Sequence, residues 1–162
     1  MKVALVQLRL DARSPSANVQ ALLAAVDRAA SVSPAPDLVV LPGACDAGGR
    51  APRKGLASAV LEGTGEAVAA KAREWGLFIA VGVHERADGR HRPVAVLFDP
   101  DGDALIKAPT FSPEGDKPET EGEDVPGLAL ADTPVGTLGV LDYTGPSSIY
   151  DVTEASSPGG LV

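Results

Sequence analysis

The feature that most constrains the fold is the alternation of short apolar runs with segments of helical periodicity. Residues 2–8, 37–41 and 77–83 are strand-length runs made mostly of apolar residues, which is typical of strands covered on both faces. Between them, residues 15–31 and 64–75 carry apolar side chains at helical spacing. The order strand, helix, strand, helix, strand predicts an α/β domain.

Local signals indicate where the two helices begin and end. Ser14 followed by Pro15 is typical of an N-cap with proline at the first helical position, and Pro34 prevents the helix from continuing. Thr64 is predicted to cap the second helix, and Gly76 is predicted to stop it after Trp75. Both helices are therefore expected to be short enough to lie side by side on one face of a sheet.

The second half of the chain has the pattern of hairpins. Strands are predicted at residues 93–99 and 104–107, joined by the turn sequence Asp-Pro-Asp-Gly, and at residues 128–131 and 137–141. Hairpins added to parallel strands give a mixed sheet, so we expect one mixed β-sheet with both helices on one face.

Two segments lack these patterns. Residues 108–127 hold four prolines and six acidic residues against one lysine, which predicts a long acidic loop, and residues 145–162 predict a poorly ordered tail. The acids do not have the spacing of a calcium loop, so no metal is expected. Residues 1–162 as a whole fit a single domain.

Charge and cysteine content exclude several classes of function. The net charge is −8, which argues against a nucleic-acid surface and against docking on anionic lipid. Cys45 is the only cysteine, so no intrachain disulfide or thiolate metal cluster forms. No run approaches the roughly 18 apolar residues of a membrane span, and the start lacks a signal-peptide pattern. We expect a soluble cytoplasmic protein without a cofactor.

Five stretches carry a family resemblance: MKVALVQL, DLVVLPGACDAGG, WGLFIAVGVHER, VAVLFDPDGDALIKAPTF and TPVGTLGVLDY. In this order and spacing they resemble the carbon–nitrogen hydrolases of the nitrilase/amidase superfamily. The resemblance covers nearly the whole chain and implies the first half of that family's four-layer α-β-β-α sandwich. The second half of the sandwich has no counterpart here.

The resemblance also assigns catalytic positions. The family attacks its substrate with a Cys thiolate, uses a Glu as the base and stabilises the developing charge with a Lys. Gly43 stands at the Glu position, Lys107 matches the Lys, and Asp142 lies at or near the Cys position. Two of the three positions are therefore not filled. The family's second glutamate corresponds to Glu114 or Glu119.

Other residues offer weaker alternatives. Cys45 lies two residues after the vacated Glu position and is an alternative nucleophile, with His84 or His91 as its base. A lone cysteine is more often a small buried hydrophobe, and both histidines fall at the edges of a predicted hairpin. Because its catalytic partners are not filled, Lys107 is interpreted as an exposed lysine at a strand end before it is interpreted as a relic of the family's lysine.

Asp142 fits a turn cap better than a nucleophile, because no neighbouring acid–base pattern supports it. The leading hypothesis is a catalytically impaired relative that acts as a partner or scaffold subunit. The alternatives are an active amidase or nitrilase with a non-standard nucleophile, and a small-ligand binder. Because the predicted strands are apolar on both faces, we expect a homodimer, or a heteromer with a partner carrying the missing half, to cover the face without helices.

Overall fold

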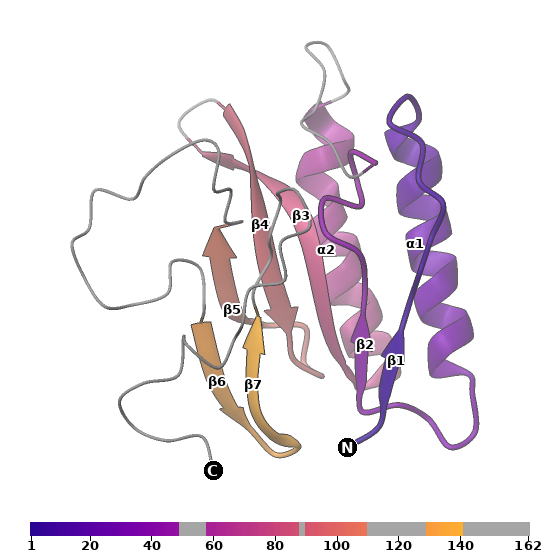
Figure 1. Ribbon diagram of the computed structural model, residues 1–162, viewed down its shortest axis with the longest axis vertical. Helices are drawn as coiled ribbons and strands as arrows, with labels where there is room; N and C mark the ends of the chain where they lie inside the picture. Colours follow the sequence, from indigo (N-terminus) through magenta and orange to yellow (C-terminus); the bar gives the residue numbers. More distant parts are fainter. Residues whose placement is uncertain (49–57, 88–89, 110–128, 141–162) are drawn as a thin grey trace, which may run out of the picture.

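The computed structural model describes residues 1–48, 58–87, 90–109 and 129–140 (Figure 1). The predicted acidic loop, beyond its first two residues, and the predicted tail lie outside these ranges. The elements are, in order, β1 (Val3–Leu5), α1 (Pro15–Ala30), β2 (Leu38–Val40), α2 (Ser58–Trp75), β3 (Phe78–Ala87), β4 (Arg90–Phe98), β5 (Ala104–Pro109), β6 (Ala129–Thr133) and β7 (Gly136–Val140).

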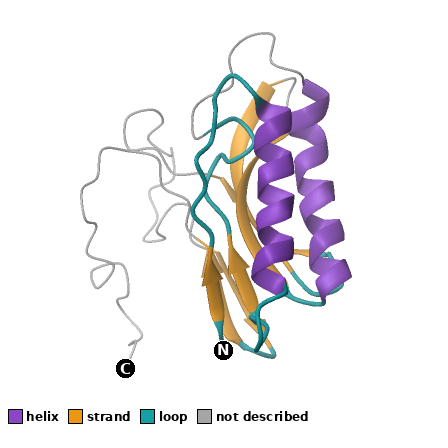
Figure 2. Ribbon diagram, turned by 90° about the vertical axis from the view of Figure 1, so that its right-hand side faces the viewer, coloured by secondary structure: helices purple, strands orange, loops and turns teal. Residues whose placement is uncertain are grey.

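The predicted mixed sheet is confirmed. Five strands lie in the order β1-β2-β3-β4-β5, with β1, β2 and β3 parallel and the other two pairs antiparallel. Figure 2 shows both helices on the same side of the strands, as predicted. Strands β3 and β4 run further than expected and pair over nine residues, so that Pro93 lies inside β4, opposite His84.

The expectation that the chain supplies only one sheet is wrong. Strands β6 and β7 form a separate two-stranded sheet that contacts β5 and β4 on the face away from the helices. Ala129, Ala131 and Val140 pack around the buried Leu138 on the side facing the large sheet, whereas Asp132 and Thr137 are exposed. A hairpin with one apolar face gains more by stacking on a sheet than by extending its edge.

The predicted start of the second helix is also wrong. Helix α2 begins at Ser58, and Thr64 is fully buried within it instead of capping its first turn. Packing against the core therefore outweighs the local preference of threonine for a cap. The two other signals are confirmed in place: Ser14 is the N-cap residue of α1, and Gly76 follows α2 with a φ of 62°.

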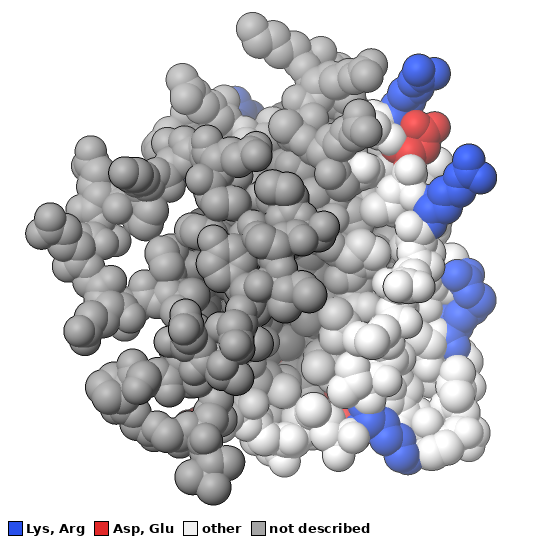
Figure 3. Space-filling view, in the orientation of Figure 1, with Lys and Arg blue, Asp and Glu red and all other residues white. Residues whose placement is uncertain are grey.

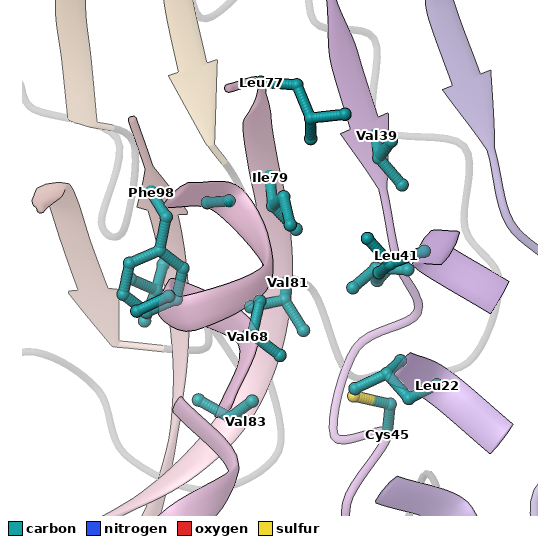
Figure 4. Packing of buried hydrophobic residues seen from close by; sticks show 14 of the residues in the cluster. Leu22, Val39, Leu41, Cys45, Val68, Leu77, Ile79, Val81, Val83 and Phe98 are labelled. Carbon is teal, nitrogen blue, oxygen red and sulfur yellow. The ribbon is translucent and has the colours of Figure 1, made fainter. Parts of the chain in front are cut away.

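The main core lies between the helices and the sheet (Figure 4). It is built from aliphatic side chains, since aromatics make up only 4% of the sequence. Leu22 and Val26 of α1 and Val68 of α2 meet Val39 and Ile79 of the sheet, and all five are fully buried. The helices are therefore packed on β2 and β3, whose carboxyl ends carry the segments considered below.

The two helices are joined by a surface cluster of charges. Lys71 Nζ lies 2.7 Å from Asp27 Oδ1 and 2.8 Å from Glu74 Oε2, and the indole of Trp75 donates to Asp27 Oδ1 at 2.8 Å. The hydrogen bonds from Lys71 and then Trp75 lower the pKa of Asp27. The hydrogen bonds to Asp27 and then Glu74 raise the pKa of Lys71.

These shifts predict how stability depends on pH. A lowered carboxyl pKa stabilises the folded state above the ordinary value of 3.8, and this contribution is lost as the pH falls through the folded-state pKa. Asp27→Asn is therefore expected to lower the melting temperature at pH 7 but not at strongly acidic pH. Thermal unfolding of both proteins across this range is the measurement. An equal difference at neutral and acidic pH would show that the charge of Asp27 contributes nothing.

Candidate functional site

The segment after β2 continues along β3. The Leu41 amide donates to the Ala80 carbonyl oxygen at 2.8 Å, and the Cys45 amide donates to the Gly82 carbonyl oxygen at 3.1 Å. Gly43, which the sequence resemblance predicts to stand at the family's Glu position, lies between them and is exposed. Ala44 has a φ of 45°, a left-handed conformation that is uncommon for a residue with a side chain. The backbone around Gly43 is thus held in a defined and unusual conformation.

Cys45 belongs to the core. Its exposed fraction is 0%, and its thiol donates to the Gly82 carbonyl oxygen with Sγ 3.3 Å away. Figure 4 shows it beside Leu22, between the sheet and the helices. A nucleophilic thiol must be reachable by its substrate and is favoured by an electropositive setting. The burial supports the interpretation of Cys45 as a packing residue.

A buried acid–histidine pair follows directly. Asp46 is 0% exposed; its Oδ1 lies 2.7 Å from Nδ1 of His84, and its Oδ2 accepts the His84 backbone N–H at 2.8 Å. The Ala47 N–H also donates to Oδ1, at 2.8 Å. The expectation that His84 lies at the edge of a hairpin is wrong, because β3 extends three residues beyond it, and His84 is only 3% exposed. Asp46 lies 38 residues before His84 in the sequence, and no motif around it indicates that the two side chains meet.

Lys107 lies elsewhere. It stands on β5 opposite Val96, and its Nζ forms a 2.7 Å ion pair with Glu85, both side chains being about half exposed. Both residues line a pocket of about 550 Å³ beside α2, with Val96 and Phe98 in its floor. Gly43 is not among the described residues of that pocket. The structure therefore does not bring Gly43 and Lys107, the two predicted catalytic positions, together in this pocket.

The other candidates do not assemble a site with these residues. His91 is opposite Arg86 in the β3–β4 hairpin and is partly buried. Asp142, Glu114 and Glu119 lie outside the described residues, and β7 ends at Val140.

Within the described ranges, no three His, Cys, Asp or Glu residues are grouped so that they could hold a metal ion. No helix in the described part of the chain is long and apolar enough to cross a membrane. Figure 3 shows Lys and Arg side chains spaced singly along one margin of the molecule, and not gathered into a basic patch on this face. The described surface in this view therefore lacks the clustered positive charge that a nucleic-acid site needs.

Comparison with known proteins decides the family. The model of the carbon-nitrogen hydrolase family matches residues 2–116, which is more than half of the chain. The chain belongs to the carbon-nitrogen hydrolase family. This confirms the resemblance drawn from the sequence. The matched range of the hydrolase family includes Gly43 and Lys107 but ends before Asp142.

Solved structures of the hydrolase superfamily share the fold. An amidase from Nesterenkonia sp. is 19% identical with a TM-score of 0.67, and the match covers 87% of this chain and 54% of that one. A mutant of the amidase from Nesterenkonia sp. AN1, with acrylamide added at its active-site cysteine, is 20% identical with a TM-score of 0.68, covering 87% and 56%. The chain thus spans about half the length of these amidases. No curated protein matches it.

Proposed function

We propose that this chain is a catalytically impaired member of the carbon-nitrogen hydrolase family that acts in the cytoplasm as a partner or scaffold subunit. The observation that carries the proposal is the segment of residues 41–47. Gly43 stands where the family has its base and has no proton acceptor. The only carboxylate in the segment, that of Asp46, is buried and already accepts bonds from His84 and Ala47.

Asp46 is a poor substitute for the missing base. A general base must come within hydrogen-bond reach of the proton that it removes. Both oxygens of Asp46 are engaged with the protein, and neither is accessible to a substrate. The nearest thiol, that of Cys45, is equally enclosed. The segment therefore offers neither an accessible base nor an accessible nucleophile.

A partner role is supported by an apolar strip along β1 and the residues just before it, defined here as Met1, Val3 and Leu5. Their exposed fractions are 68%, 44% and 76%. Strand β1 is the edge of the large sheet, and the small sheet stacks at the opposite end, over β5 and β4. We propose that a second copy of the chain, or a heteromeric partner, covers this strip. Exposed apolar side chains gathered at a sheet edge favour association.

Sedimentation equilibrium over a dilution series tests the partner role. The isolated chain is expected to self-associate, with the weight-average mass falling towards that of a monomer on dilution. If the partner is instead a different chain, the isolated protein should remain monomeric and bind an apolar dye through the open strip. A monodisperse monomer at micromolar concentration that binds no such dye would contradict the proposal.

Restoring the missing base alone is expected to create no activity. In Gly43→Glu a carboxylate returns to the family position, but the chain still has no accessible thiolate to attack an amide or nitrile. Steady-state assays on simple amides are the measurement, with Gly43→Gln as the matched control that has the size of Glu without its basicity. Turnover by the Glu variant but not by the Gln variant would mean that a nucleophile is present, and Cys45→Ala would then identify it.

The pocket beside α2 favours a second candidate, a small-ligand binder. Its buried apolar floor and the Lys107–Glu85 ion pair at its edge suit a ligand with an apolar body and a polar end. Saturable binding without turnover, lost in Phe98→Ala, would support this function over that of a scaffold.

A further inference from the structure

Asp46 and His84 are ionisable groups buried in the core, and neither is needed by the proposed function. Such groups are costly to bury unless every polar atom finds a partner, so their retention calls for a role. We propose that Asp46 and His84 form a latch that holds residues 42–47 in one position on β3, with Asn18 of α1 as its third member. This inference is independent of whether the chain acts as a scaffold.

Strand β3 extends beyond its parallel partner β2. Strand β2 ends at Val40, whereas β3 continues to Ala87, so within the described ranges no strand pairs with the later residues of β3 on that side. The His84 backbone N–H donates instead to Oδ2 of Asp46 at 2.8 Å. The carboxylate thus takes the place of a strand carbonyl, and its other oxygen holds the imidazole Nδ1 at 2.7 Å.

The side chain of Asn18 connects residues 42–47 to helix α1. Asn18 is 3% exposed; its side-chain nitrogen donates to the Asp46 carbonyl oxygen at 3.4 Å and to the Asp11 carbonyl oxygen at 2.8 Å. Its side-chain oxygen accepts the Asp11 N–H at 2.8 Å. The loop before α1, the first turn of α1 and the segment after β2 are therefore joined through one amide side chain.

The backbone of residues 42–47 needs contacts that keep it in its observed conformation. Ala44 adopts a left-handed conformation, which disfavours the observed path of the segment unless contacts elsewhere enforce it. The neighbouring Cys45 is fully buried only as long as the segment stays against β3. If the contact between Asp46 and His84 is removed, we expect residues 42–47 to detach locally from β3 and expose the thiol of Cys45. The single cysteine is therefore a built-in reporter of the latch.

The experiment measures the rate at which a maleimide modifies Cys45 under native conditions, alongside urea unfolding of each variant. In Asp46→Asn the rate is expected to rise at least tenfold more than its loss of global stability explains. This additional labelling rate should not change at low urea concentrations, because a local opening exposes little new surface. Asp132→Asn, at an exposed position on β6, is the matched control and should label at the wild-type rate.

A second pair of variants separates positioning from bulk. His84→Ala removes the imidazole contact to Asp46 Oδ1 and keeps the backbone N–H that donates to Oδ2. His84→Asn instead places an amide near the position of the imidazole Nδ1. Labelling should be fast in the alanine variant and close to wild type in the asparagine variant. Equal labelling in these two, or rates that follow global stability throughout, would overturn the latch and leave the pair as ordinary core residues. If Asp46→Asn does not fold, the comparison of His84→Ala with His84→Asn tests the latch by itself.

Discussion

Gly48→Ala is expected to lower the free energy of unfolding by about 2–4 kcal/mol, combining a backbone clash with a left-handed conformation. Gly48 has a φ of 74°, and a Cβ atom placed on it would lie 2.6 Å from the backbone nitrogen of Ala12 and 2.8 Å from its Cα. Neither atom can move without displacing the loop before α1. Urea unfolding of the variant and the wild type is the measurement.

Gly76→Ala is the matched control for this substitution. Gly76 has a similar φ of 62°, but a Cβ atom there would meet nothing within 4 Å. Only the conformational penalty then remains, which is about 1–2 kcal/mol. Equal losses in the two variants would mean that the close approach between Gly48 and Ala12 does not constrain the fold.

Leu5→Asp is expected to weaken association by at least about 100-fold, which corresponds to roughly 2.7 kcal/mol. Leu5 is 76% exposed in the isolated chain and is the most accessible member of the apolar strip. In an interface over β1 an aspartate would be buried without a partner, and an unpaired buried charge costs more than this. Because the side chain is exposed in the monomer, the fold itself should tolerate the change.

Sedimentation equilibrium of the Leu5→Asp protein measures this effect. Val32→Asp is its control, since Val32 is 58% exposed but lies in the loop after α1, outside the strip. The control should associate like the wild type. Association that persists unchanged in the Leu5 variant would exclude the apolar strip as the interface.

Much of the fold could be predicted because its determinants are local. The apolar runs of β2 and β3 and the stop at Gly76 each depend on a few neighbouring residues, and the structure has them as expected. The stacking of β6 and β7 could not be predicted, because a short hairpin with one apolar face has the same sequence pattern whether it extends a sheet or packs on one. Thr64 was predicted to cap a helix, but it is buried inside α2, because packing in the core outweighs its preference for a cap.

The candidate site was less predictable. The sequence resemblance picks out Gly43 and Lys107. Their surroundings, however, depend on how far β3 and β4 extend and on the sheet face that each side chain occupies. The contact between Asp46 and His84 joins residues far apart in sequence, and neither has a neighbour that marks it. The interpretation of Cys45 as a packing residue needed only the general behaviour of lone cysteines and agrees with its burial.

The central claim, that the chain does not catalyse carbon–nitrogen hydrolysis, is tested most directly by steady-state turnover of a panel of simple amides and nitriles. Loss of a nucleophile or its base typically removes most of an enzyme's rate enhancement. The wild type is therefore expected to match the buffer blank and to be indistinguishable from Cys45→Ala and Lys107→Ala. Turnover above the blank that follows the protein through purification and is abolished by either substitution would contradict the account.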